Sequence, residues 1–273
     1  MLLRHQLPQV YSQFLPREIL DFGPEETKAT CDNCAMSRPQ NKAKIHYRAD
    51  LKCCTFHPLV PNYMVGAILL DENAQAGQEI LKDKIARREY SLPIGMVAPV
   101  KYQVEFNARK ENDFGQREDW LCPYYEKSNG NCNIWKNRGV VCTTFFCKSS
   151  YGKVGLKFWD SLSSYLWYVE LALLEEALTM LDFSPRQVMT LLDYHNRQDG
   201  TAAEKKSWVL PEKTSRELWN GYYEDQEGFF IKAHNIIANM DKKAFHEAVG
   251  EQGLDLEEQI FALLPRLVKE SSK

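Results

Sequence analysis

The stretch LCPYYEKSNGNCNIWKNRGVVCTTFFC, residues 121–147, carries four of the eight cysteines of this protein. They are Cys122, Cys132, Cys142 and Cys147, with nine, nine and four residues between them. The other four come earlier as two close pairs, Cys31 with Cys34 and Cys53 with Cys54, and no cysteine follows residue 147 in a chain of 273 residues. This crowding predicts that the thiols meet around metal. Residues 31–54 would form one wall of the site and residues 122–147 the other.

The composition is that of a globular protein, with 44% hydrophobic and 12% aromatic residues. A formal net charge of -3 argues against binding nucleic acid through bulk electrostatics. No apolar run reaches the length of about 18 residues that a membrane span needs, and Arg4 and Pro8 interrupt any export signal. We therefore expect a cytoplasmic protein. In that reducing compartment, cysteines serve as metal ligands or redox groups more often than as structural disulfides.

The sequence predicts an α-rich α+β fold, in which a loop-rich cysteine half, residues 1–156, packs as one unit on a helical half, residues 157–273. Prolines 8, 16 and 24 predict an N-terminal strap without a long helix. Residues 73–90 read as a helix, with Lys84 on its narrow apolar stripe. Residues 91–107 read as a strand, because apolar residues alternate at Val100, Tyr102, Val104 and Phe106.

Helices are predicted throughout the second half. A strong amphipathic pattern covers residues 157–182 at Phe158, Leu162, Leu166, Val169, Leu173, Ala177 and Met180. Ser184 and Pro185 predict the start of a second helix that continues to about residue 197. Thr214 with Glu217 would cap a third. Residues 224–250 follow as helix with a break near residues 240–241. Asp255 with Glu258 would open a last helix, kinked at Pro265.

Thiolate sulfur suits two kinds of inorganic site. Zinc takes four ligands in a tetrahedron, with zinc–sulfur distances of about 2.3 Å, and an iron–sulfur cluster such as 4Fe-4S also takes four cysteines. Zinc ribbons carry two C-x2-C pairs, whereas this chain has only Cys31 and Cys34 in that spacing. The irregular spacings, the adjacent pair and the surrounding aromatic residues favour one or two iron–sulfur clusters. Zinc remains the alternative, and any single cysteine could instead be a small buried hydrophobic residue.

The order of these residues resembles the YkgJ-type family of zinc- or iron-chelating cysteine-cluster domains, to which the flagellin lysine-methylase proteins are also similar. The resemblance covers about residues 31–147. This chain differs from the family in three respects. The first two cysteine pairs are further apart, Trp135 stands where tyrosine is frequent, and Gly139 stands where proline commonly follows the arginine. It implies metal binding and leaves the activity open. The matching positions are Cys31, Cys34, Cys53, Cys54, Cys122, Cys132, Ile134, Trp135, Arg138, Cys142 and Cys147.

Two further residues are candidates for contact with a cofactor. His57 follows Cys54 by three residues and could be a ligand, could donate a hydrogen bond to a cluster sulfur, or could be an ordinary loop histidine. Arg138 stands between two proposed cysteine ligands, where it could pair with the negative charge of a cluster or with a surface carboxylate.

Several common catalytic motifs are missing: the phosphate-binding G-x-x-x-x-G-K-[ST] loop, G-x-G-x-x-G, G-x-S-x-G and H-E-x-x-H. The sequence identifies no catalytic residue.

The sequence leaves three functional hypotheses. The first is an iron–sulfur protein for electron transfer or for a redox or modification reaction, with a protein or redox partner. The second is a zinc-stabilised interaction module whose C-terminal helices bind a partner, and the third is a thiol redox site at Cys53 and Cys54.

Overall fold

The computed structural model describes residues 3–21, 29–30, 33–34, 36–37, 47–197 and 199–271. Within these ranges the fold is rich in helices and contains small antiparallel sheets, which confirms the α-rich α+β prediction. The helices are α1 Gln9–Ser12, α2 Arg17–Leu20, α3 Asn62–Leu70, α4 Gln75–Ala86, α5 Val100–Asn107, α6 Val140–Thr144, α7 Gly152–Met180, α8 Pro185–Leu192, α9 Glu212–Trp219, α10 Gln226–Ala238, α11 Lys242–Phe261 and α12 Leu264–Ser271. The strands are β1 Ala29–Thr30, β2 Asn33–Cys34, β3 Val60–Pro61, β4 Ser91–Leu92, β5 Gly95–Met96, β6 Tyr125–Glu126 and β7 Asn131–Cys132.

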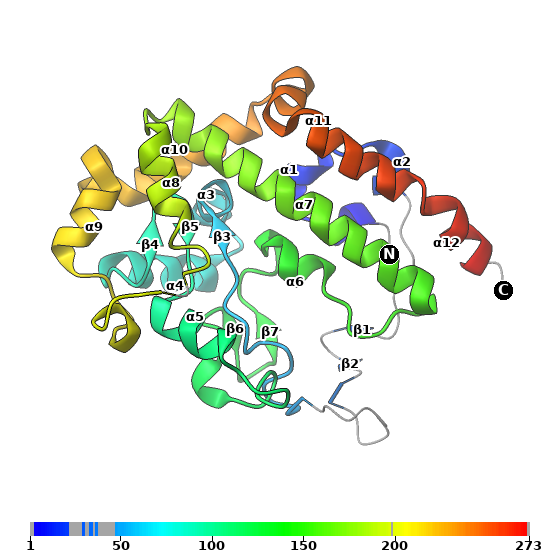
Figure 1. Ribbon diagram of the computed structural model, residues 1–273, viewed down its shortest axis with the longest axis horizontal. Helices are drawn as coiled ribbons and strands as arrows, with labels where there is room; N and C mark the ends of the chain where they lie inside the picture. The colour runs from blue at the N-terminus through cyan, green and yellow to red at the C-terminus, as the bar shows by residue number, and fades with distance from the viewer. Residues whose placement is uncertain are drawn as a thin grey trace.

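Helix α7 runs across the molecule and separates two layers (Figure 1). Helices α11 and α12 pack along one side of it, and α6 packs on the other side, toward the segments that carry the cysteines. The predicted apolar stripe is buried from Phe158 to Ala177, whereas Met180, in the last turn, is 61% exposed. The stripe therefore explains why α7 is at the centre of the fold.

The two predicted halves share one hydrophobic core. Helix α3 of the first half packs on α10 of the second, and a Cβ atom on Gly66 would lie 2.0 Å from the carbonyl oxygen of Phe230. The absence of a side chain at residue 66 is what lets the two backbones approach. The boundary at residue 156 lies within α7, and residues on both sides of it belong to the same buried cluster.

The predicted strand at residues 91–107 is wrong for its second part. Residues Val100 to Asn107 form α5, which starts directly after Pro99, and only the short strands β4 and β5 precede it. Apolar residues at every second position over eight residues also place some on one helical face, so the alternation was ambiguous. Proline fixes φ and has no N–H, which suits the residue that begins a helix. Val100 and Tyr102 are buried in the helical arrangement.

The predicted start of helix α8 is confirmed, because the Ser184 and Gln187 side chains cap it reciprocally and Pro185 occupies the first turn, whereas the predicted end near residue 197 is wrong, since α8 ends at Leu192. The break near residues 240–241 is also confirmed, because Asp241 caps α11 by accepting a hydrogen bond from the backbone N–H of Ala244 at 2.8 Å.

Two other predicted helix starts are wrong. Helix α9 begins at Glu212 after Pro211, so Thr214 lies inside it. Helix α11 continues through Asp255 and bends instead at Gly250, where φ is 58°. Pro265 lies in the first turn of α12 and does not kink it, since an N–H in that position would have no helical partner.

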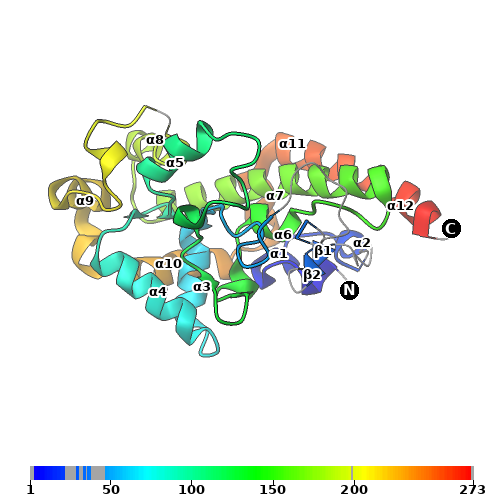
Figure 2. The ribbon, with the colours of Figure 1, turned by 90° about the horizontal axis from the view of Figure 1, so that it is seen from below.

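The N-terminal strap is built from one-turn helices, as predicted. Pro8 and Pro16 directly precede α1 and α2, and Pro24 lies outside the described residues. Figure 2 shows α1 and α2 on the lower side of α7 and α11. There Phe14 stacks on Phe245 with ring centroids 4.5 Å apart. Among the described helices, none has the length and apolar character required to cross a membrane.

Candidate metal centre

Five of the cysteines line one cavity of about 420 Å³, which we call the cysteine cavity. They come from three separate segments: the turn before residue 56, the region around the β6–β7 hairpin, and α6. Aromatic side chains, Arg109 and Arg138 complete the lining. The cysteines are Cys53, Cys54, Cys122, Cys132 and Cys142.

A tight turn explains how the adjacent cysteines reach the same cavity. In an extended segment Cys53 and Cys54 would face opposite sides, but Lys52 has a φ of 56° and the Cys54 N–H donates to the Leu51 carbonyl at 3.0 Å. The Cys54 carbonyl in turn accepts a hydrogen bond of 2.8 Å from the Cys122 N–H. This backbone bond joins the upstream cysteine pair to the downstream stretch.

The β6–β7 hairpin presents Cys132 to the cavity. Tyr125 and Cys132 are paired across it, and Gly130, with a φ of 71°, closes its turn. The Lys52 Nζ donates to the Gly130 carbonyl at 2.8 Å and so fixes this turn to the one that carries Cys53 and Cys54.

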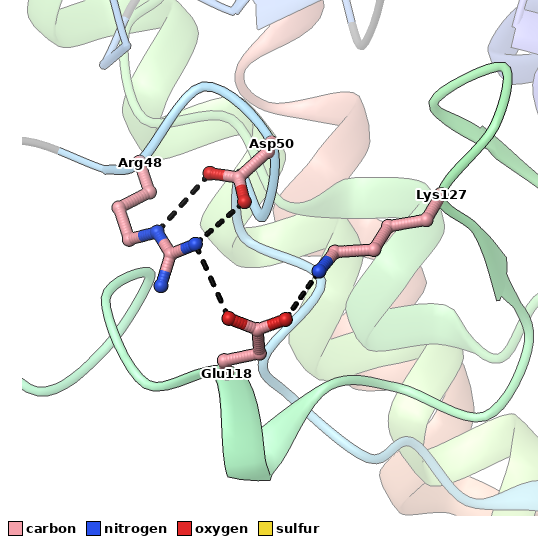
Figure 3. A network of polar contacts seen from close by, with 4 residues as sticks. All are labelled: Arg48, Asp50, Glu118 and Lys127. Atoms are coloured by element: carbon pink, nitrogen blue, oxygen red, sulfur yellow. Dashed lines mark hydrogen bonds and ion pairs between the residues drawn. The ribbon is translucent and has the colours of Figure 1, made fainter.

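Polar side chains at the surface connect the same loops. Figure 3 shows Arg48 bonded through Nη2 to Asp50 at 2.6 Å and to Glu118 at 3.3 Å, while Lys127 pairs with the other oxygen of Glu118. The side chains of these groups are between 38% and 54% exposed, so each pair adds little stability. The network links the segments near residues 50, 118 and 127, from which three of the cysteine-bearing loops continue.

Helix α6 carries Cys142 and is held by a buried carboxylate that the sequence analysis missed. Glu170 Oε1 accepts hydrogen bonds from the Val140 N–H at 2.8 Å and from the Tyr11 hydroxyl at 2.9 Å. Burial raises the pKa of Glu170 to about 8, against the opposing effect of these bonds. The sequence did contain a signal that could have identified Glu170. It lies four residues after Leu166 and three before Leu173, and this spacing places a glutamate on the apolar face of α7.

This carboxylate predicts a pH dependence of stability. Between its ordinary pKa of 4.5 and its folded pKa of about 8, Glu170 keeps a proton that the unfolded chain releases. The free energy of unfolding should therefore fall as pH rises through this window, by at most about 1.4 kcal/mol per pH unit. In Glu170→Gln, which keeps the acceptor oxygen, this slope should flatten in urea unfolding measured from about pH 5 to pH 8.

Glu176→Gln, on the same helix but outside this hydrogen-bond network, is the matched control and should keep the wild-type slope. An equal slope in Glu170→Gln and in the wild type would show that Glu170 is not the group that titrates.

Cys34 and Cys147 lie near Cys53 but do not line the cavity. The hydrogen bond with Cys54, burial and the neighbouring Cys34 thiol raise the pKa of Cys53. Burial and the Cys53 thiol raise the pKa of Cys147 to about 11, and the Cys147 Sγ lies 3.9 Å from the Tyr47 hydroxyl. Cys31, the eighth predicted ligand, lies outside the described residues.

Positive charge faces the buried thiols. Arg138 is 8% exposed, its guanidinium carbon lies 3.4 Å from the centre of the Trp135 ring, and its Nη1 donates to the Cys142 carbonyl at 3.3 Å. Burial raises the pKa of Cys142, and the Arg138 charge acts in the opposite direction. Lys84 is 3% exposed and pairs with Glu89 at 2.7 Å, and its charge likewise opposes the rise in the pKa of Cys122. The sequence analysis had placed Lys84 only on the apolar stripe of its helix.

His57 lies beside the cysteine loops and lines a different cavity, of about 150 Å³. Its ring stacks on Tyr102 with centroids 4.1 Å apart, and burial lowers its pKa to about 3, so the imidazole is neutral. Nε2 is 3.0 Å from the Leu121 carbonyl, which can only accept, so Nε2 carries the proton. In this geometry His57 orients the residue that precedes Cys122.

No disulfide joins the seven described cysteines. Within the described ranges, no three His, Cys, Asp or Glu side chains converge in the manner of a site for a metal ion. The five cavity thiols line one common volume of about 420 Å³. Comparison of the chain with protein-family models, with curated protein sequences and with solved structures gave no match.

Proposed function

We propose that the cysteine cavity holds an iron–sulfur cluster, 4Fe-4S in type, and that the protein serves electron transfer or a redox or modification reaction. The observation that supports this most directly is a single cavity of about 420 Å³ lined by five thiols. One water molecule occupies about 30 Å³ of the liquid, so the cavity offers far more room than a lone ion requires. A cluster of several metal and sulfide atoms also keeps its ligating sulfurs further apart than a single zinc ion does.

The donor set and its surroundings suit an anionic cluster. Cys53, Cys54, Cys122, Cys132 and Cys142 are the candidate ligands at the cavity, and Cys34 and Cys147 are candidates for a second site or for completing this one. Buried cations stabilise negative charge in a medium of low dielectric constant. Arg138 and Lys84 are placed to do so, while the Leu121 carbonyl bond of His57 positions Cys122.

The cluster would supply a one-electron centre, and the residues around it would control access. Trp135 and Phe145 line the cavity and are 47% and 45% exposed, so the cavity lies close to the surface that a protein or redox partner would meet. A cytoplasmic location is part of this proposal, since thiols remain reduced there. We also propose that the resemblance to the YkgJ-type family reflects a shared metal-binding arrangement.

Anaerobic purification with metal analysis and a visible spectrum tests the proposal. We expect a brown protein that contains iron and acid-labile sulfide and shows broad visible absorption. A colourless protein with stoichiometric zinc would favour the structural zinc hypothesis instead. Metal-free protein whose Cys53 and Cys54 cycle between thiols and a disulfide would favour the thiol redox hypothesis. Either of these two results would reject the iron–sulfur cluster.

A further inference from the structure

A second large cavity lies beside the cysteine cavity and has different chemistry. It has a volume of about 740 Å³ and is bounded by the N-terminal segment, the end of α3, residues 135–137 and α10. We call it the N-terminal cavity. Trp135 is on the lining of both cavities, so this residue lies in the wall between them. The volume is in the range of small-molecule sites, about 300–1,000 Å³.

Nitrogen donors outnumber carboxylates on its lining. The lining includes Arg4, Lys136, His5 and His234, but among its described residues only one carboxylate, that of Asp71. The Oδ1 of Asp71 already accepts hydrogen bonds from the backbone and side-chain nitrogens of Asn73, at 3.0 and 3.3 Å. Lys136 lies 3.8 Å from the other oxygen and is 70% exposed, so it can also pair with an incoming anion.

Arg4 contains a donor that is not satisfied. Its Nη2 pairs with Asp21, but its Nε is buried and has no hydrogen-bond partner among the described residues. A buried N–H without an acceptor costs free energy, and such groups are usually paired with protein, water or a ligand. Because Nε is buried while the Arg4 side chain as a whole is 36% exposed, a ligand in the cavity would contact the exposed part of the side chain and not Nε.

His234 offers the complementary group. Its Nδ1 is 3.2 Å from the Tyr63 carbonyl, which can only accept, so Nδ1 carries the proton. This bond depends on the close approach of α3 and α10, because the missing side chain of Gly66 leaves room for His234. Burial lowers the pKa of His234, which favours the neutral ring. Nε2 is then a hydrogen-bond acceptor in the cavity lining.

We propose that the N-terminal cavity binds a small hydroxylated anion, a carboxylate or a phosphate ester. Its anionic group pairs with Lys136 and Arg4, and its hydroxyl donates a hydrogen bond to His234 Nε2. This inference goes beyond the proposed cluster and does not depend on it. Arg4 and His234 lie outside the cysteine-bearing loops, and Lys136 lies in one of these loops but is not a proposed ligand.

Isothermal titration calorimetry of the purified full chain, which measures the Kd of two probes, tests this site. Glycerol 3-phosphate represents the phosphate esters and lactate the carboxylates, so the pair distinguishes the two sources of the anion. At least one should bind saturably with a Kd below about 1 mM. Iron content is measured in the same preparations, so a failure of the cluster proposal is seen separately from a failure of this one.

Two variants locate the binding. Lys136→Ala removes an exposed cation, and His234→Asn keeps a donor for the Tyr63 carbonyl while removing the Nε2 acceptor. Each should weaken binding about tenfold. The control is Lys213→Ala, an exposed lysine of α9 away from the cavity, and it should leave the Kd unchanged. Binding of neither probe, or binding that Lys136→Ala does not weaken, would overturn the proposal.

Discussion

Cys142→Ser is expected to lose most of the bound iron together with the visible absorption. A serine hydroxyl is a poor substitute for a thiolate toward iron, and Cys142 lines the cysteine cavity together with Cys53 and Cys132, both of which interact with it electrostatically. Because the binding energy of a metal site is also folding energy, the free energy of unfolding should fall by about 3 kcal/mol or more. Metal analysis and thermal unfolding of anaerobic protein measure both effects.

Unfolding of the metal-free proteins shows whether the loss of stability in Cys142→Ser comes from the lost metal. After chelation, Cys142→Ser and the wild type should unfold at similar temperatures, since the variant then lacks only a thiol. Thr143→Ser is the matched control on the same helix, because serine can keep the hydroxyl hydrogen bond to the Val140 carbonyl, which is 3.0 Å in the wild type. An unchanged iron content in Cys142→Ser would remove Cys142 from the set of ligands.

Gly66→Ala should be strongly destabilising, although it adds only one methyl group. The added Cβ would lie 2.0 Å from the Phe230 carbonyl oxygen and 2.6 Å from the His234 Cβ, so α3 and α10 would have to separate. Overpacking of this kind costs about 1–3 kcal/mol and can cost more. Here the clash is with backbone, which cannot move aside as a side chain can, and we expect a loss of about 3 kcal/mol or more in urea unfolding.

Gly221→Ala is the control for this substitution, because no atom lies within 4 Å of the position where its Cβ would be. It should change the free energy of unfolding by less than about 0.5 kcal/mol. Similar losses in the two variants would show that the cost comes from the backbone preference of glycine and not from the α3–α10 contact.

Local patterns predicted the second half well where periodicity and capping agreed. The stripe of α7 and the start of α8 at Ser184 and Pro185 both depend on residues within a few positions of each other, so the sequence contains the full information. The same reasoning failed at α5, where eight residues of alternating pattern fitted two structures. It failed again at Asp255, because a capping pattern can also occur inside a helix, and here the break lies earlier, at Gly250.

For the site, too, the sequence predicted some features and missed others. Cysteine clustering predicted that distant segments would meet, and five cysteines of the two walls do line one cavity. The sequence left open how the adjacent Cys53 and Cys54 could face one site, and the structure answers this with a turn at Lys52 that directs both to that cavity. Glu170 and Lys84 were not recognised as charged groups near the site, because their significance arises only when other segments bury them.

The sequence by itself determined the helix-rich class, the central amphipathic helix and the set of candidate metal ligands, because composition, periodicity and ligand chemistry are properties of the chain. Only the tertiary structure decided which thiols share a cavity, which charges lie beside them, and that a second, polar cavity adjoins them through Trp135. These features depend on contacts between residues far apart in the chain, such as Cys54 with Cys122 and Glu170 with Val140. Such contacts have no local signature, since they form only when packing brings the segments together.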